Sequence, residues 1–593
     1  MARGATTTAE AGPGRARWVF LTLPLAPLAL FAYGAFEWLF FATKPSFLTV
    51  LPFAEQLEIL FRAPLPFVGP VLLCQLGATL LSLLLFPRLR WLGVVPAAAL
   101  LAALVLALVH NFLYVLAGAG LTSNTALVRV VHGTVLAAGF VLWLRKLAVE
   151  MPSHRGWILW AAATPILLGA LFAAPETPDA AAALPTLPRG GANVLILSID
   201  GVDAGRLSAY GYRAATSPFM ESLAPETLFC ENAFSNAQQT YTSQTSLLTG
   251  KLPFTTKVIV PPSILRGDDA VQHLPAIFRR SGYRTLQLSM RHFGDAEDAN
   301  LQEGFDLTNY RWENRLSTQR VEQLYDSARP FRLAVIDRLD GTLARLFGTR
   351  PVSDDFARVI GGTSDPFWSD AKRVDAFFSF VDGGRGPWFA HVHLLDTHSA
   401  NRFTRGPLRV GTDLYDNQLR DADEEVRRVF DGLRRRAQLE RTVVVVTSDH
   451  PRKWLFGPKA RIPLMIRFPE RRHARREPRN AQMLDVAPTV LDFLGVAPPR
   501  WLEGDSLLRP ENLRDDRPIF ASAEVRASEL PRPPHYGIRE AGLVAGSGWY
   551  SLDLQTGRMR RGAIEGHTRP SPPLPGPRAR ALLEEMLVRR GLR

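Results

Sequence analysis

The chain has 593 residues, more than one core of ordinary size uses, so we expect at least two domains. Hydrophobic residues make up 47% and charged residues 21%, which excludes a mainly disordered chain. The two cysteines, Cys74 and Cys230, lie far apart in sequence, which excludes a disulfide framework and a CxxC zinc site. Residues 1–175 hold 11 Lys and Arg against 5 Asp and Glu, and the remainder holds 58 against 51. Because this net charge of +13 is spread along the chain, it requires no nucleic-acid partner.

Five apolar segments in the first third of the chain are each long enough to cross a bilayer, which takes about 20 residues. Basic residues gather before the first segment, between the second and third, and between the fourth and fifth. Because such residues stay on the cytoplasmic side, we expect a cytoplasmic N-terminus. An odd number of spans then places the chain after residue 175 outside. The expected spans are about 18–42, 65–86, 91–117, 126–144 and 157–174.

Polar residues inside these segments leave two interpretations open. Glu37 lies in the first segment, and His110 and Asn111 lie in the third. Such residues either contact a lipid headgroup or form hydrogen bonds between helices. The loop 43–64 has the pattern of a short amphipathic segment at the outer surface of the membrane. Residues 175–192, rich in Pro, Ala and Gly, are typical of a semi-stiff linker.

At residue 193 the pattern changes to that of a soluble α/β domain. Three continuous apolar runs of strand length are NVLILSI at 193–199, WFAHVHLL at 388–395 and TVVVVT at 442–447. Helical patterns lie between them, for example at 274–283 and 421–438. Buried strands that alternate with amphipathic helices predict a mainly parallel sheet covered by helices on both faces.

Metal-binding and acid–base residue types follow all three strands. Asp200 follows the first strand, Asp396 and His398 follow the second, and Asp449 and His450 follow the third. The carboxyl ends of parallel strands meet at one edge of the sheet, where ligands bind. A single Asp in this position is often only the cap of the next helix, but three groups together predict a site.

A hydroxyl-rich helix start forms the fourth part of the expected site. TYTSQTSLLTG at 240–250 leads from Thr and Ser into apolar residues and ends on Gly250, a helix stop. The free N–H groups and the dipole of a helix start favour anions. The alternative is that Thr and Ser only cap this helix.

The soluble half carries a run of motifs in a fixed order: LILSIDG, then YGY with TSPFMESLA at 210–224, NAFSNAQQTYTSQTSLLTG, HLLDTHS, TSDH, RIPLMIRFP and LDVAPTVLDFLGV. Over roughly residues 193–510 this order resembles the sulfatase branch of the alkaline phosphatase superfamily. The spans ahead of it resemble the layout of bacterial lipoteichoic acid synthases and phosphoethanolamine transferases. The resemblance implies a five-helix transmembrane bundle followed by an α/β alkaline-phosphatase-like (sulfatase) domain.

The resemblance also implies roles for individual residues. Asp200 matches the first metal-binding acid of the family, and Asp449 and His450 match its later metal-binding pair. Thr240 stands where the family keeps its nucleophile, and His398 matches the His that contacts the substrate or the leaving group. Substrate-binding roles fall on Ser243, Asp396 and Lys459.

Thr240 favours phosphoryl chemistry over formylglycine chemistry. Sulfatases convert a Cys or Ser at this position into formylglycine, which Thr cannot form, and Gln244 stands where they have Arg. A Thr hydroxyl whose pKa is lowered by a metal can attack phosphorus and form a phospho-threonine. We therefore expect a divalent metal held by Asp200, Thr240, Asp449 and His450. The His ligand favours zinc or manganese, with calcium as the alternative.

The sequence departs from the family pattern in two places. Pro451 stands where the family usually has Gly, and one acid follows the first strand instead of two. A full second metal site is therefore not evident, and Asp396 could complete one or could orient His398. Of His391 and His393, which lie inside the second strand, we expect at least one to be a core residue.

The expected organisation is a transmembrane domain at 1–174, the linker at 175–192 and a catalytic domain at 193–510. A helical, Arg-rich insertion at 307–362 either caps the site, touches the membrane or lies in solvent. Residues 511–593 are expected to form a C-terminal subdomain and tail, with a small sheet, a Pro-rich link and a final basic helix at 540–593.

Three functions compete. The first is a membrane-anchored transferase that moves phosphoglycerol or phosphoethanolamine from a phospholipid donor to an envelope acceptor. The second is a hydrolase of sulfate or phosphate esters, and the third is a catalytically silent envelope-binding protein. Each places the protein in the bacterial cytoplasmic membrane as a multi-pass protein whose soluble domain lies outside the cytoplasm. Beyond lipid and acceptor, the sequence indicates no protein partner.

Overall fold

A computed structural model of the protein separates the chain into two compact units. Unit 1 comprises residues 1–44, 51–176 and 315–353, and unit 2 comprises residues 45–50, 177–314 and 354–593. The residues that the structure describes are 14–43, 46–108, 126–151, 153–172, 183–188, 190–290, 294–309, 328–347, 369–398, 409–410, 413–452, 457–509, 511, 513–514, 516–525 and 534–593.

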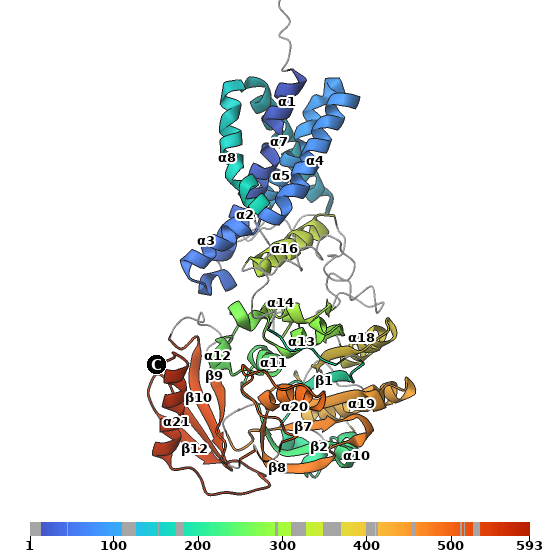
Figure 1. Ribbon diagram of the computed structural model, residues 1–593, viewed down its shortest axis with the longest axis vertical. Helices are drawn as coiled ribbons and strands as arrows, with labels where there is room; N and C mark the ends of the chain where they lie inside the picture. The colour runs from blue at the N-terminus through green and yellow to red at the C-terminus, as the bar shows by residue number, and fades with distance from the viewer. Residues whose placement is uncertain are drawn as a thin grey trace, which may run out of the picture. The chain divides into compact units, whose positions relative to one another are not determined.

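Unit 1 consists of helices (Figure 1). Those of the N-terminal part are apolar on most of their surface, which is typical of helices surrounded by lipid or by other helices. Large apolar side chains such as Leu73, Leu84 and Leu171 are exposed on them, as expected of a lipid-facing surface. The helices are α1 (Arg15–Thr22), α2 (Leu25–Thr43), α3 (Phe53–Arg62), α4 (Leu65–Leu85), η2 (Pro87–Val94), α5 (Val95–Leu108), α7 (Ala126–Glu150), α8 (Ser153–Phe172) and α16 (Arg329–Phe347).

Three stretches of the described residues are long and apolar enough to cross a membrane, whereas the sequence predicted five. They are Arg15–Thr43, Phe53–Leu85 and Pro87–Val105. The predicted span at 157–174 falls on a shorter apolar helix, Arg155–Leu171. The predicted span at 126–144 falls on α7, whose last turns carry Arg145, Lys146 and Glu150.

The part of the third predicted span beyond residue 108, with His110 and Asn111, lies outside the described residues. The loop predicted to be amphipathic contains the short helix α3.

An eight-stranded sheet forms the centre of unit 2, in the order β4-β3-β5-β1-β6-β7-β2-β8. It is mainly parallel, as predicted; β7 runs antiparallel to both of its neighbours. β1, β5 and β6 are buried along their whole length, which explains their continuous apolar sequences. The strands are β1 (Asn193–Ile199), β2 (Leu228–Phe234), β3 (Arg284–Leu288), β4 (Leu307–Thr308), β5 (Trp388–Leu394), β6 (Thr442–Ser448), β7 (Arg461–Arg467) and β8 (Arg475–Gln482).

Two apolar clusters cover the two faces of this sheet. Alternate residues of β1 point to opposite sides, so that Leu195 and Leu197 join one cluster and Val194 and Ile196 join the other. The first cluster includes residues of α10 (Pro218–Leu223), α18 (Asp370–Asp382) and α19 (Leu414–Arg435), and the second includes residues of α11 (Thr240–Thr249), α13 (Leu274–Arg280) and α20 (Val486–Phe493).

A second sheet, four-stranded and antiparallel, follows in the order β12-β11-β10-β9. The last helix, α21, lies against it (Figure 1), and Leu583 and Leu587 of α21 share a core with Leu543 and Tyr550. The predicted small sheet and final helix are therefore present. The elements are β9 (Ile519–Val525), β10 (Ile538–Ala545), β11 (Gly548–Asp553), β12 (Met559–Ala563) and α21 (Gly576–Arg589).

The predicted insertion at 307–362 is not one continuous helical segment. Its first residues form β4, an edge strand of the central sheet that pairs with β3. Its helix α16 belongs to unit 1 and packs on α7. Residues 310–327 and 348–362 lie outside the described part of the chain.

Candidate active site

The ends of β1 and β6 bring Asp200 and Asp449 together, as the sequence predicted for neighbouring parallel strands. Both carboxylates are buried. The backbone N–H groups of Gly201 and His450 donate to Oδ1 of Asp449 at 2.9 and 2.8 Å. Gly201 has a φ of 59°, the left-handed conformation that favours glycine, and this turn lets its N–H reach Asp449. The Asp449 carboxylate is thereby held in one orientation.

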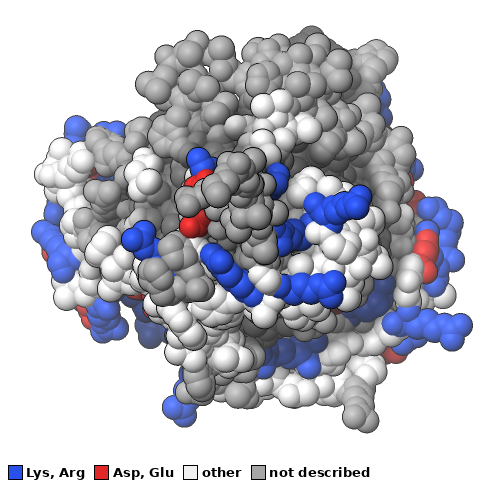
Figure 2. All heavy atoms as spheres, turned by 90° about the horizontal axis from the view of Figure 1, so that it is seen from above, with Lys and Arg blue, Asp and Glu red and all other residues white. Residues whose placement is uncertain are grey.

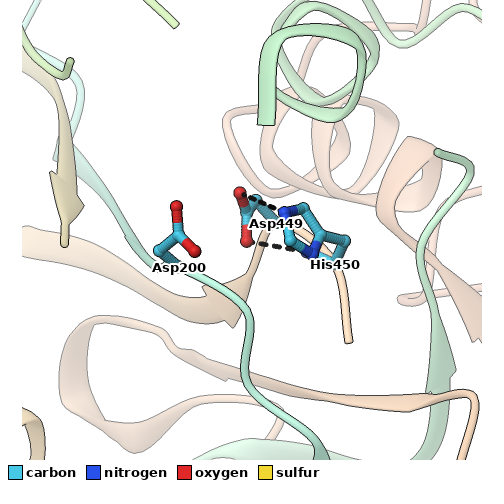
Figure 3. A group of neighbouring side chains, drawn as sticks. All are labelled: Asp200, Asp449 and His450. Atoms are coloured by element: carbon cyan, nitrogen blue, oxygen red, sulfur yellow. Dashed lines mark hydrogen bonds and ion pairs between the residues drawn. The ribbon is translucent and has the colours of Figure 1, made fainter. Parts of the chain in front are cut away.

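Asp200, Asp449 and His450 form a cluster whose ligand atoms all lie within 4.8 Å of one another (Figure 3). Oδ2 of Asp449 is buried and has no hydrogen-bond partner among the described residues. Nδ1 of His450 donates to the carbonyl of Pro451 at 2.9 Å, so Nε2 is left as an acceptor. Pro451, the departure from the family pattern, therefore helps to orient the imidazole.

Thr240 is the first residue of α11 and completes this group. Its hydroxyl donates to Oδ2 of Asp200 at 3.3 Å and lies 3.3 Å from Nε2 of His450. The helix begins after Gln239, which has an extended backbone, and ends at Gly250, which has a φ of 66°. Two carboxylates, an imidazole nitrogen and a hydroxyl thus converge.

This donor set fits a divalent cation. Oδ2 of Asp449 is buried without a donor, and Nε2 of His450 presents a lone pair; both are atoms that a cation would satisfy. Mixed oxygen and nitrogen donors suit zinc or manganese better than calcium, which prefers more oxygen ligands. The geometry therefore agrees with the metal ligands expected from the sequence.

Charges within the cluster shift the pKa values of two of its members. Burial opposes the charged form of Asp200, but hydrogen bonding with His393 and the nearness of His450 lower its pKa. Burial also opposes the charged form of His450, but Asp449 and Asp200 raise its pKa above the ordinary value. Because a cation bound at Nε2 would need His450 neutral, protons would compete with it, more strongly at lower pH.

Two of the other predicted site residues contact the backbone instead. Ser243 is buried and donates from Oγ to the carbonyl of Thr240 at 3.1 Å. Asp396 is buried, and its Oδ1 accepts from the backbone N–H of Asp370 at 3.2 Å, at the start of α18. Neither side chain belongs to the metal-binding cluster. His398 is exposed in the turn after β5.

Lys459 is also exposed and lines a cavity of about 640 Å³. Arg452 lies in the same cavity with its guanidinium 3.7 Å from the ring centre of Tyr415. Nη1 of Arg452 is buried and has no hydrogen-bond partner in the described part of the chain. Trp549 and Arg560, from the C-terminal sheet, also line the cavity, together with Arg206 and the acidic residues Asp203, Asp413 and Glu565. An anionic group would complement the buried Nη1 of Arg452 in this mixed wall.

Sequence reasoning assigned no role to Thr397, and for His391 and His393 it predicted only that at least one is a core residue, which left the other to reach the site. Thr397 donates from Oγ1 to the carbonyl of Asp200 at 2.6 Å and anchors the end of β1. His393 places Nε2 3.5 Å from Asp200 and 3.7 Å from Asp449. The signal for His393 was its position on the strand: it lies beside Ser198, two residues before Asp200, and so on the same side of the sheet edge.

Lys and Arg side chains are scattered over the face drawn in Figure 2, with few Asp and Glu among them. This distribution agrees with the basic excess spread along the sequence.

Comparisons with known proteins give the family. The Sulfatase family model matches residues 192–496, just over half of the chain. Human N-acetylgalactosamine-6-sulfatase is 24% identical over an alignment of 373 residues that covers 55% of this chain and 67% of that protein. N-acetylglucosamine-6-O-sulfatase of Bacteroides thetaiotaomicron is 32% identical over 96 residues, 14% of this chain and 17% of that protein.

Solved structures align with the chain at low sequence identity. A protein in the alkaline phosphatase superfamily from Vibrio parahaemolyticus aligns with a TM-score of 0.45 and 16% identity, covering 68% of this chain and 89% of that one. Phosphonate monoester hydrolase of Agrobacterium radiobacter aligns with a TM-score of 0.42 and 18% identity, covering 67% and 95%. With the Sulfatase model matched over the domain that holds Asp200, Thr240 and Asp449, the chain belongs to the sulfatase family.

Proposed function

We propose that the protein is a membrane-anchored, metal-dependent transferase that moves phosphoglycerol or phosphoethanolamine from a phospholipid to an envelope acceptor. The observation that supports this most is the Thr240 hydroxyl, which lies 3.3 Å from Asp200 and from His450. A Thr at this position cannot become formylglycine, but it can act as a nucleophile at phosphorus.

The residues present account for both halves of the reaction. A divalent cation held by Asp200, Thr240, Asp449 and His450 would lower the pKa of the hydroxyl and offset the charge of the phosphoryl oxygens. Oγ1 of Thr240 forms a bond to phosphorus while the bond from phosphorus to the diacylglycerol oxygen breaks, and the hydroxyl proton leaves along the hydrogen bond to Asp200. His398 donates a proton to the departing alkoxide. An acceptor hydroxyl then attacks the phospho-threonine and gives its proton to His398, while the bond from phosphorus to Oγ1 breaks and Thr240 takes back the proton held at Asp200.

The apolar helices of unit 1 explain how a lipid donor would be used. A catalytic domain tethered to a bilayer meets phospholipid at a high effective concentration. We propose that the chain crosses the bacterial cytoplasmic membrane five times, with a cytoplasmic N-terminus and the catalytic domain outside. The helices α7 and α8, on which the predicted spans 126–144 and 157–174 fall, would supply the fourth and fifth spans.

The cavity lined by Arg452 and Lys459 supports an anionic substrate. Arg452 as a whole is half-buried and lies over the ring of Tyr415, but its Nη1 is buried without a partner among the described residues, and an anionic group that reached it would supply an acceptor. We propose that Arg452 and Lys459 bind the anionic part of the substrate that does not react.

A covalent adduct tests the transferase directly. The purified full chain is incubated with vesicles of phosphatidylglycerol or of phosphatidylethanolamine, and the peptide that contains Thr240 is weighed by mass spectrometry. We expect diacylglycerol release and an added phosphoglycerol or phosphoethanolamine mass on Thr240, with neither in Thr240→Ala. Thr245→Ala, on the same helix with Oγ1 bonded to the carbonyl of Tyr241, serves as the control and should keep both signals. Diacylglycerol release by Thr240→Ala at the wild-type rate would exclude the mechanism.

Hydrolysis of sulfate or phosphate esters is the second candidate, and the relatives favour it. The 24% identical human relative is named as a sulfatase. In this reaction water replaces the acceptor alcohol at the same residues. Turnover of aryl sulfate or aryl phosphate without diacylglycerol release from vesicles would select the hydrolase. Metal binding with no ester cleaved would select the silent envelope-binding protein.

A further inference from the structure

A chain of buried polar side chains leads from the interior of unit 2 to the carboxylates of the metal-binding cluster. It runs through Gln287 on β3, His391 on β5, Ser198 on β1 and His393 on β5. All four side chains are buried within adjacent strands of the sheet. The proposed metal chemistry assigns no role to any of them.

Two backbone groups determine which atom donates in the hydrogen bond between Gln287 and His391. Oε1 of Gln287 accepts from the backbone N–H of Ala296 at 2.6 Å, and Nε2 donates to the carbonyl of Gly294 at 3.0 Å. A backbone N–H can only donate and a carbonyl can only accept, so the amide of Gln287 has one orientation. Its Nε2 is then a donor where it meets Nδ1 of His391 at 3.4 Å.

The orientation of the Gln287 amide also determines which atoms of His391 and Ser198 donate and which accept. Burial lowers the pKa of His391 to about 3, so its imidazole is neutral and carries a single proton. With Nδ1 accepting from Gln287, that proton is on Nε2 and is donated to Oγ of Ser198 at 3.1 Å. Nε2 of Gln244 donates to the same oxygen at 3.4 Å. The hydroxyl proton of Ser198 is therefore directed to Nδ1 of His393 at 2.9 Å.

We infer that His393 is a positioning residue whose Nε2–H is aimed at the carboxylates of Asp200 and Asp449 by this directed hydrogen-bond chain. Nε2 lies 3.5 Å from Oδ2 of Asp200 and 3.7 Å from Oδ2 of Asp449. Nε2 of His393 is buried, and of these two carboxylate oxygens the nearer is Oδ2 of Asp200; Oδ2 of Asp449, also buried, lies 3.4 Å from Nε2 of His450 as well.

The Nε2–H donor of His393 affects how the carboxylates of Asp200 and Asp449 are held. It holds the two carboxylates at a fixed separation and offsets part of their mutual repulsion. Because Nδ1 of His393 already accepts from Ser198, the ring offers no lone pair toward the carboxylates and is not itself a ligand. Loss of residues that hold metal ligands in place typically weakens metal binding by about 10–100-fold.

Metal affinity of the full chain in detergent tests this inference, which rests on the proposed metal centre. The zinc dissociation constant is measured by competition with a chelator, and the melting temperature is measured in excess chelator. We expect His393→Leu to weaken zinc binding by about 10–100-fold. His393→Gln, whose side-chain N–H can reach the same place, should recover most of the affinity. Ser198→Ala, which removes the group that sets the tautomer, should weaken binding in the same direction.

The control is Thr447→Val, because Thr447 lies beside Ser198 on β6 and donates to the carbonyl of Pro463 at 2.9 Å, outside the chain. It should leave the dissociation constant unchanged. Wild-type affinity in both His393→Leu and Ser198→Ala would overturn the inference while leaving the metal centre intact. Failure of His393→Gln to recover any affinity while the metal-free protein melts normally would also overturn it, since a ligand would then have been lost. A wild-type chain that binds no zinc would overturn both the inference and the proposed centre.

Discussion

Arg338 in α16 donates from Nε to the Glu37 carboxylate in α2 at 2.7 Å, although 301 positions separate them in sequence. The Glu37 side chain is 1% exposed, and the Arg338 guanidinium also lies 3.8 Å from the ring centre of Phe40. The polar residue inside the first apolar segment thus has a protein partner within unit 1. Of the two interpretations that the sequence left open for Glu37, contact between helices is the one the structure supports.

Breaking this pair should destabilise unit 1. Arg338→Ala leaves a buried carboxylate unpaired, which typically costs about 3–5 kcal/mol. We expect a lower melting temperature in detergent for Arg338→Ala, and recovery when Glu37→Gln is added, because the unpaired charge is then removed. Lys146→Ala is the control, since its pair with Glu150 is exposed and longer, at 3.9 Å. Equal melting temperatures for Arg338→Ala and Lys146→Ala would contradict the role of the pair.

Replacing Thr240 and replacing Ser243 should have very different effects on turnover. Thr240→Ala removes the attacking hydroxyl and should lower turnover by about 10³-fold or more, while Thr240→Ser keeps a hydroxyl and should retain part of it. Ser243→Ala removes only a bond to the carbonyl of Thr240 and should change turnover much less. Release of diacylglycerol from phospholipid vesicles, or of nitrophenol from an aryl ester, measures all three. A loss in Ser243→Ala as large as in Thr240→Ala would restore the substrate-binding role first assigned to Ser243.

Asp449 should be required for metal binding. Asp449→Ala removes a carboxylate that the backbone holds in place, so elemental analysis of the purified variant should find little metal. Asp423→Asn is the matched control, because Asp423 is also buried and also accepts from two backbone N–H groups, at the start of α10. It should keep the wild-type metal content. A full metal complement in Asp449→Ala would show that the ligands are assigned wrongly.

Reporter fusions should reveal the topology. A periplasmic reporter joined after residue 180 should be active, and one joined after Arg90 should be inactive, because Arg88 and Arg90 hold their loop on the cytoplasmic side. A cytoplasmic reporter should give the opposite pattern at both points. Activity of the periplasmic reporter after Arg90 would contradict the predicted orientation, and its inactivity after residue 180 would contradict an odd number of spans.

The sequence predicted the strands and the convergence of Asp200, Asp449 and His450 for one physical reason, whereas the place of Thr240 was implied by the family resemblance. Buried parallel strands appear as continuous apolar runs, and their carboxyl ends meet at one edge whatever the details of packing. The same reasoning could not find the link from Ser198 to His393. That link depends on the register of β1 against β5, which lie 195 positions apart at this point, and no local pattern encodes it.

The substrate-binding roles predicted for Asp396 and Ser243 stay predictions, and the structure adds backbone contacts to both side chains. Asp396 and Ser243 lie near the expected site, and their residue types suit substrate binding. A short polar side chain near a helix start also satisfies the backbone, and the structure shows both residues in such contacts. The cavity wall contributed by Trp549 and Arg560 was missed because the C-terminal sheet carries no motif that ties it to the cluster.

His273 should make the protein less stable in acid. It is fully buried as the N-cap of α13, where Nδ1 accepts from the backbone N–H of Ala276 at 3.2 Å and Nε2 donates to the carbonyl of Ala270 at 3.1 Å. Burial lowers the pKa of His273 from 6.5 to about 3, so between these values the unfolded chain binds a proton that the folded chain does not. The contribution of neutral His273 to the free energy of unfolding is therefore complete above pH 6.5 and is lost as the pH falls toward 3, at up to about 1.4 kcal/mol per pH unit.

His273→Asn keeps an N-cap oxygen but cannot titrate, so its melting temperature should fall less steeply than that of the wild type across this range. Parallel melting curves against pH for the two proteins would show that His273 is not buried in its neutral form.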